Sequence, residues 1–215
     1  MSACCDPSGC RRMFDARHAE RNARDFRKKG LDATGERLVR SVARRGLTEA
    51  RVLEIGGGVG GLAIELLRAG AARAVNVEIS PEYEGAALGL ARDLGFEGRI
   101  ERVIGDAAEV VPALGPFDVV VMHRVVCCYA DADRLMSVAA RASQRLLALT
   151  FPRPTPIVRL GLAVGNLWFR IIRNGFRVFA HSPGTILGAV AREGLRPVED
   201  FEGFFWRGVV LERGT

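Results

Sequence analysis

The residues whose types and spacing most clearly suggest ligand binding lie in a glycine-rich segment in the first third of the chain. Glu54 is followed by glycines at positions 56, 57, 58, 60 and 61. Glycine lets the backbone approach a ligand closely and adopt positive φ angles. An acidic residue about 20 positions after such a loop can bind ribose hydroxyls, and Glu78 has roughly that spacing. The pattern predicts a nucleotide-like ligand between a glycine loop and a carboxylate.

Two ligand patterns fit this loop. Gly56, Gly58 and Gly61 match the dinucleotide pattern G-x-G-x-x-G. Glu54, Gly56, Gly58 and Gly60 match the E/D-x-G-x-G-x-G pattern of S-adenosylmethionine (SAM) enzymes. A tight strand-to-helix turn without a ligand also uses such glycines.

The surrounding residues favour a cationic ligand. The carboxylate of Glu54 would repel a pyrophosphate but suits a sulfonium or an ammonium group. Asp106 follows a predicted strand, where it can accept a hydrogen bond from an adenine amino group. Short-chain dehydrogenases use Tyr-x-x-x-Lys, and neither Tyr83 nor Tyr129 has a lysine four residues later. A nicotinamide-dependent oxidoreductase is therefore the less favoured alternative.

Alternating strands and helices must position these residues. We expect one or two amphipathic helices within residues 11–45, broken near Gly30, and then strands and helices in turn. The strands are expected at 51–55, 74–78, 100–104, 117–122, 145–151, 195–200 and 204–212, and the helices at 60–69, 131–142, 157–173 and 183–192. This order predicts an α/β protein with a doubly wound, mostly parallel sheet. The short gap between the last two strands predicts a hairpin, and hence an antiparallel edge strand.

From Arg51 to Glu212 the chain resembles class I SAM-dependent methyltransferases. The resemblance rests on Val-Leu-Glu-Ile-Gly-Gly-Gly-Val-Gly at 52–60, Asn-Val-Glu-Ile-Ser-Pro at 76–81, Gly-Asp at 105–106 and Phe-Asp-Val-Val-Val-Met-His at 117–123. It implies a Rossmann-like sheet of seven strands with an antiparallel last strand, S-adenosyl-L-methionine as cofactor, and methyl transfer as the activity. A non-catalytic protein that binds an adenosyl ligand or docks on membranes is a further alternative.

The resemblance also assigns site residues. It implies that Gly56, Gly58 and Gly60 lie under the methionine part of SAM, with Glu54 nearby. It further implies Glu78 at the ribose hydroxyls, Ile79 against the adenine, Asp106 and Ala107 at the adenine amino group, and His123 facing the methyl group.

The methyl acceptor is expected to contact an insertion at residues 152–192. Residues 145–192 resemble the C-terminal region of magnesium-protoporphyrin O-methyltransferases. The insertion is apolar and rich in arginine, which suits a small-molecule acceptor that is both apolar and anionic. We predict Arg124, Arg170 and Arg177 as acceptor-binding residues. A core helix with solvated arginines and a membrane-surface helix are the alternatives.

The chemistry of the acceptor decides whether a base is needed. A carboxylate acceptor needs none, whereas a hydroxyl or an amine would. His123, Tyr129 and His181 are the candidate bases, in that order. A histidine at a strand end can instead be a structural hydrogen-bonding group.

Composition and charge bound the class of protein. The chain is 48% hydrophobic and 26% charged, as in an ordinary globular protein, and its net charge is +6. We expect a Cys-rich tail and helical cap at 1–45 and a SAM-binding domain at 46–215. No export signal is visible, and the longest apolar run is too short to span a bilayer, so a cytoplasmic location is expected. Nucleic acid is a less favoured partner because the basic residues lack interleaved aromatics. Peripheral membrane contact stays open, and the sequence does not indicate the oligomeric state.

The five cysteines form two groups without the spacing of a zinc site. They are Cys4, Cys5, Cys10, Cys127 and Cys128. The simplest interpretation is five unlinked thiols and no metal. The alternative is that the two groups meet at the active site and bind a soft metal or metalloid.

Overall fold

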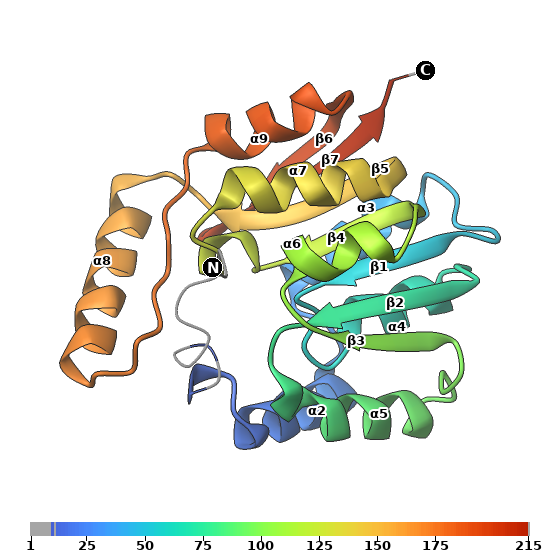
Figure 1. The fold of residues 1–215 in the computed structure, drawn as a ribbon, viewed down its shortest axis with the longest axis horizontal. Helices are drawn as coiled ribbons and strands as arrows, with labels where there is room; N and C mark the ends of the chain where they lie inside the picture. The colour runs from blue at the N-terminus through green and yellow to red at the C-terminus, as the bar shows by residue number, and fades with distance from the viewer. Residues whose placement is uncertain (1–9, 11, 215) are drawn as a thin grey trace.

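A seven-stranded sheet forms the centre of the molecule (Figure 1). The computed structural model describes residue 10 and residues 12–214. The strands are β1 Arg51–Ile55, β2 Arg73–Glu78, β3 Ile100–Ile104, β4 Phe117–His123, β5 Ser143–Pro152, β6 Leu195–Glu202 and β7 Trp206–Arg213. Their order in the sheet is β3-β2-β1-β4-β5-β7-β6.

The sheet confirms the predicted mostly parallel topology with a C-terminal hairpin. Strands β1 to β5 pair in parallel, whereas β7 is antiparallel to both β5 and β6. The hairpin forms one edge of the sheet, with β7 inside and β6 outside. The strand order reverses between β1 and β4. In doubly wound sheets the ligand binds at the carboxyl ends of the strands beside this switch point.

Helices cover both faces of the sheet, as the alternating pattern predicted. They are α2 Ala16–Lys29, α3 Ala33–Ala43, α4 Gly61–Arg68, α5 Glu84–Asp93, α6 Ala107–Val110, α7 Ala132–Ala142, α8 Pro156–Ile171 and α9 Pro183–Arg192, with 3-10 turns η1 Pro81–Tyr83, η2 Val111–Ala113 and η3 Val126–Cys128. One core contains side chains of α6, α7 and α9, and the core on the opposite face contains those of α3 and α4.

The inner strands β1 and β4 are largely apolar on both faces because helices bury both faces. In β1, Leu53 belongs to the core with α7 and its neighbour Val52 to the core with α3 and α4. Successive side chains of a strand point to opposite faces, so a doubly covered strand is apolar throughout. The valine-rich β4 follows the same rule.

The N-terminal helices are part of these layers. Helix α2 ends at Gly30, whose φ of 70° confirms the predicted break. Helix α3 begins after Asp32, whose side chain accepts hydrogen bonds from the N–H groups of Thr34 and Gly35. Leu38 of α3 is buried against α4, and α2 lies beside α5.

Helix α8 stands away from the sheet at the left of Figure 1. Val158 is its one buried residue. In the part of the chain that the structure describes, no helix has the length and apolar character needed to cross a membrane.

Candidate functional site

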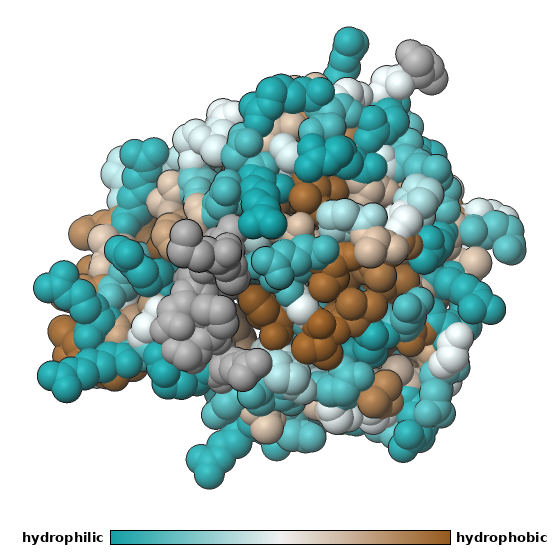
Figure 2. Space-filling model, viewed as in Figure 1, coloured by the Kyte–Doolittle hydropathy of each residue, from teal (hydrophilic) through white to brown (hydrophobic). Residues whose placement is uncertain are grey.

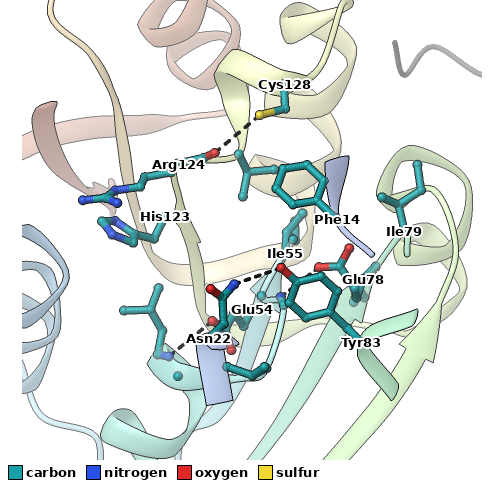
Figure 3. Close-up of a pocket in the computed structure, with 18 of the residues that line it drawn as sticks. Phe14, Asn22, Glu54, Ile55, Glu78, Ile79, Tyr83, His123, Arg124 and Cys128 are labelled. Atoms are coloured by element: carbon teal, nitrogen blue, oxygen red, sulfur yellow. Dashed lines mark hydrogen bonds between the residues drawn. The ribbon is translucent and has the colours of Figure 1, made fainter. Parts of the chain in front are cut away.

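A cleft of about 640 Å³ opens at the carboxyl ends of the strands next to the switch point. Its lining comes from the ends of β1, β2 and β4, from the glycine loop and from the N-terminal helices. Figure 3 shows Glu54 and Glu78 at the lower part of this cleft, His123 and Arg124 at its left, and Cys128 at its top. The volume is in the range of small-molecule sites.

The glycine loop needs glycine for conformation and for space. Gly56, Gly58 and Gly60 have φ angles of 63°, 54° and 85°, which disfavour any residue with a Cβ. A Cβ at Gly56 would lie 2.6 Å from a methyl of Val125, and one at Gly58 would lie 3.0 Å from the Tyr83 ring. The loop is therefore built to present backbone to the cleft, where a ligand can approach closely.

Glu54 lines the cleft, but its carboxylate is hydrogen-bonded to the backbone at the start of α4. Its buried carboxylate accepts hydrogen bonds from the N–H groups of Leu62 and Ala63 and from the side chain of Asn76. Burial raises the pKa of Glu54 to about 7, against the opposing effect of these donors. Glu54 thus stabilises the helix start behind the loop, and its charge acts on the cleft from a fixed position.

Glu78 links the end of β2 to the glycine loop. Its carboxylate accepts hydrogen bonds from Gly58 N–H at 2.8 Å and from Ser80 N–H at 3.0 Å. Burial raises the pKa of Glu78, and the two N–H donors oppose that effect. Ile79 follows it in the lining, and the Tyr83 hydroxyl accepts a hydrogen bond from Asn22 across the cleft (Figure 3).

Arg102 supports the loop from behind, and sequence reasoning missed it. Its side chain is 5% exposed and donates to the carbonyl of Gly58 at 2.7 Å and to Asn76 Oδ1 at 2.8 Å. Its charge also lowers the pKa values of Glu54 and Glu78 against the stronger effect of burial. A single arginine in a strand carries no motif, so only the fold reveals this role.

Tyr129 is buried and bonded to Asp106, which does not favour its predicted role as a base. The phenol donates a hydrogen bond to Asp106 Oδ1 at 2.7 Å. The same oxygen accepts a hydrogen bond from Ala108 N–H at the start of α6. Asp106, Ala107 and Tyr129 all line the cleft, so the pair belongs to its wall.

His123 is held on both sides of its ring. Nε2 lies 3.1 Å from Asp32 Oδ2, and Nδ1 lies 2.9 Å from the Thr150 hydroxyl. An ionised carboxylate can only accept, so Nε2 carries the proton. The Thr150 oxygen already accepts from Arg124 N–H, so its own hydrogen is available to Nδ1. In this tautomer the lone pair of Nδ1 accepts from the Thr150 hydroxyl, so neither ring nitrogen is left to take a proton from the methyl acceptor.

Asp32 joins the N-terminal helices to this end of the cleft. Arg124 donates to Asp32 Oδ2 at 2.6 Å, and the Arg124 guanidinium lies 4.9 Å from the centre of the Trp206 ring. Burial of Asp32 opposes its ionisation, but the hydrogen bonds from His123 and Gly35 and the positive charge of Arg124 hold its pKa below its usual range. No sequence motif indicated Asp32, which lies 91 residues before His123.

Three predicted site residues lie elsewhere. His181, Arg170 and Arg177 are not among the described residues that line the cleft. His181 Nε2 is 2.8 Å from the Tyr129 carbonyl, and its ring stacks on Phe179. It therefore supports the wall from outside, and the two arginines are exposed.

Helix α2 and the segment before it contribute lining residues that the sequence did not identify. Phe14, His18 and Asn22 line the cleft. His18 and Asn22 are four residues apart and therefore lie on one side of α2, and Phe14 lies just before that helix. That spacing is a usable signal, but it does not tell which element lies opposite.

Two of the cysteines reach the same part of the cleft. Cys10 and Cys128 both line it and belong to one apolar cluster with Phe176. Cys127 Sγ lies 3.8 Å from Cys128 Sγ. Among the described residues no group of three or more His, Cys, Asp or Glu side chains could hold a metal ion. Cys4 and Cys5 lie outside the described residues.

The charges around the cleft suit a cation better than a phosphate. Five of the described lining residues are acidic and one is arginine; the acids are Asp25, Asp32, Glu54, Glu78 and Asp106. These carboxylates can accept hydrogen bonds from ribose hydroxyls and attract an ammonium or a sulfonium group, and the glycine loop beside them lets a ligand approach the backbone. The residues present therefore fit SAM.

Comparisons with known proteins agree with this geometry. Residues 52–147 match the family described as a methyltransferase domain. A comparison with curated proteins gives no match. Among solved structures, the magnesium protoporphyrin IX methyltransferase of Synechocystis PCC 6803 with bound SAH is 25% identical, with a TM-score of 0.67 over 84% of this chain and 82% of that chain.

Two further structures share the fold. A SAM-dependent methyltransferase from Mesorhizobium loti is 17% identical, with a TM-score of 0.67 over 86% of this chain and 100% of that chain. The geranyl diphosphate C-methyltransferase of Streptomyces coelicolor A3(2) is 15% identical, with a TM-score of 0.65 over 85% of this chain and 77% of that chain.

The fold, the cleft and these matches together support a class I SAM-dependent methyltransferase. Residues 52–147 are the part that matches a methyltransferase domain, and S-adenosyl-L-methionine is the cofactor.

Proposed function

We propose that this enzyme methylates a small apolar molecule that carries an anionic group, and that the anionic group approaches Arg124. The observation that carries the proposal is that the candidate bases in the cleft, Tyr129 and His123, already have hydrogen-bond partners within the protein. Tyr129 donates to Asp106, and both nitrogens of His123 have partners. An acceptor that is already ionised at neutral pH needs no base, whereas an alcohol or an amine would.

In this proposal one end of the cleft binds SAM and the other end binds the methyl acceptor. Glu78 would bind the ribose, Ile79 would lie against the adenine, and Asp106 with Ala107 would hold the adenine amino group. Gly56, Gly58 and Gly60 would contact the methionine part, with Glu54 behind them. When bound, SAM would supply an electrophilic methyl group: a lone pair of the acceptor forms the new bond to the methyl carbon, and the C–S bonding pair stays on sulfur, which leaves as the thioether of SAH.

The acceptor would enter on the side of Phe14, His123 and Arg124. Among the described residues that line the cleft, Arg124 is the only arginine. It already pairs with Asp32, but its side chain is 44% exposed, so it can also bind an anionic group of the acceptor. Asp32 and Trp206 hold its guanidinium on two sides. Correct alignment of acceptor and methyl group is the main contribution expected of the protein, of order 7–11 kcal/mol at most.

Neighbouring structures support an acceptor of this kind. Two of them are named for magnesium protoporphyrin IX and geranyl diphosphate, which both combine an apolar body with anionic groups. The division into a cap at 1–45, a domain at 46–215 and a substrate-side insertion at 152–192 is part of the same proposal. So is a cytoplasmic location.

Methyl transfer from labelled SAM to matched acceptors tests the proposal. Magnesium protoporphyrin IX would be compared with its dimethyl ester, and geranyl diphosphate with geraniol. We expect incorporation into the anionic member of at least one pair, with KM raised about tenfold or more in Arg124→Gln. Arg170→Gln is the matched control, and its KM should not change. Equal turnover of the neutral members, or no effect of Arg124→Gln, would contradict the anionic acceptor.

A further inference from the structure

Helix α8 presents a stripe of apolar side chains to solvent. Six exposed residues form this α8 stripe: Ile157, Leu160, Val164, Leu167, Trp168 and Ile171. At 3.6 residues per turn they share about 100° of the helix surface. Leu160 is 64% exposed and Trp168 is 60% exposed. A single exposed leucine is ordinary, but a contiguous apolar patch of this kind marks an interaction surface.

The opposite face of α8 already packs against the protein. Val158 is buried, and the ring of Phe169 lies 5.3 Å from that of Phe176. Asn166 donates to the Val178 carbonyl and accepts from Val178 N–H, which ties the helix to the returning chain. The helix can therefore keep its position while the stripe faces outward.

The chain segment that contains the stripe carries positive charge and no negative charge. Between residues 134 and 192 the sequence contains nine arginines and no Asp or Glu. Arg159 and Arg170 lie on α8 itself, and Arg173 and Arg177 follow it; all four are exposed. In Figure 2 brown apolar residues lie among teal hydrophilic ones at the left margin, where Figure 1 places α8.

A second exposed aromatic side chain lies near the start of α8. Phe204, at the turn between β6 and β7, is 83% exposed. Arg153, three residues before α8, holds this turn: its N–H donates to the Phe205 carbonyl, and its side chain pairs with Glu202. Arg153 therefore connects the turn that carries this exposed aromatic side chain to the segment that leads into α8.

We propose that the α8 stripe docks on an anionic phospholipid membrane, with Arg159 and Arg170 at the lipid phosphates. An amphipathic helix with Trp and Leu on one face and arginine beside it binds the interface of a bilayer in this way. Charge selects this occupant. A second copy of the chain would bring like charges together, whereas an acidic lipid surface complements them. The proposal does not depend on the identity of the methyl acceptor.

Co-sedimentation with vesicles tests this docking. The full chain would be mixed with phosphatidylcholine vesicles, with and without phosphatidylglycerol, at low and high salt. We expect binding to the anionic vesicles that weakens with salt. The triple variant Leu160→Ser, Trp168→Ser, Ile171→Ser should bind at least about tenfold more weakly, because it removes buried apolar area. Arg159→Gln and Arg170→Gln should each cost about fivefold.

Matched variants on other surfaces provide the controls. Leu88→Ser with Val198→Ser removes two apolar residues that are 42% and 45% exposed, and Arg73→Gln with Arg196→Gln removes two exposed charges. Unchanged SAH affinity shows that each variant is folded. Three results would overturn the proposal: no binding of the wild type to anionic vesicles, equal losses in the control variants, or a wild-type dimer in light scattering that the triple variant converts to a monomer.

Discussion

Asp32 Oδ2 lies 3.1 Å from Nε2 of His123 and so connects the N-terminal helices to the end of β4. The carboxylate also begins helix α3, where its other oxygen accepts from Thr34 and Gly35 N–H. One residue thus fixes a helix start and the tautomer of a histidine in the cleft.

The first prediction concerns that tautomer. Long-range ¹⁵N–¹H NMR spectra of the neutral His123 ring should show the proton on Nε2 and a lone pair on Nδ1, because Asp32 can only accept a hydrogen bond. Asp32→Ala should lower the free energy of unfolding by about 1 kcal/mol through loss of the helix cap, whereas Asp32→Asn keeps the cap and should change it by less. A proton found on Nδ1 would refute the network.

A second prediction separates backbone strain from ligand binding. Gly58→Ala places a Cβ at a φ of 54° and 3.0 Å from the Tyr83 ring. Gly95→Ala is the control, because Gly95 has a φ of 77° and open space around it. Each should cost about 1–2 kcal/mol of stability from the left-handed conformation. Calorimetric titration with SAH should show lost affinity only in Gly58→Ala. Equal affinities in the two variants would remove Gly58 from the ligand site.

The buried Glu54 predicts a pH dependence of stability. Burial raises the pKa of Glu54 to about 7 from its ordinary value of 4.5, so the folded state retains the proton over that interval. Stability must therefore fall as pH rises from 4.5 to 7, by at most about 3 kcal/mol. Glu54→Gln lacks this titration. Urea unfolding of both proteins across this range should show the wild type losing stability relative to the variant. Parallel curves would contradict the raised pKa.

Tyr129→Phe tests whether this phenol is a base or part of the wall. The variant loses the hydrogen bond to Asp106 Oδ1, which costs about 1 kcal/mol and lowers SAH affinity several-fold. We expect kcat at saturating SAM to stay within about threefold of the wild type. A fall of about 100-fold or more in kcat at unchanged SAH affinity would instead restore the catalytic role.

Local patterns predicted most of the fold and the cofactor end of the cleft. The glycines, the strand ends at Glu78 and Asp106, and the apolar strands are encoded within short segments. Boundaries differ by a few residues: β5 begins at Ser143 where 145 was expected, and β7 begins at Trp206 where 204 was expected.

Long-range pairs could not be predicted in the same way. The contacts of Asp32 with His123 and of Arg102 with Gly58 join segments that are 91 and 44 residues apart. Helix α8 shows the other limit. Periodicity indicates which residues share a face, but not what covers that face, so the α8 stripe could equally have been buried.

The central claim is that the glycine loop and Glu78 bind the adenosyl cofactor. Calorimetric titration of the wild type and of Glu78→Gln with SAH and with NADH tests it most directly, with Glu101→Gln as an exposed control. We predict saturable one-to-one binding of SAH by the wild type and by Glu101→Gln, and no binding of NADH. Glu78→Gln should bind SAH about 10- to 100-fold more weakly, because a charged acceptor is lost. Binding of NADH in place of SAH, or full SAH affinity in Glu78→Gln, would contradict the account.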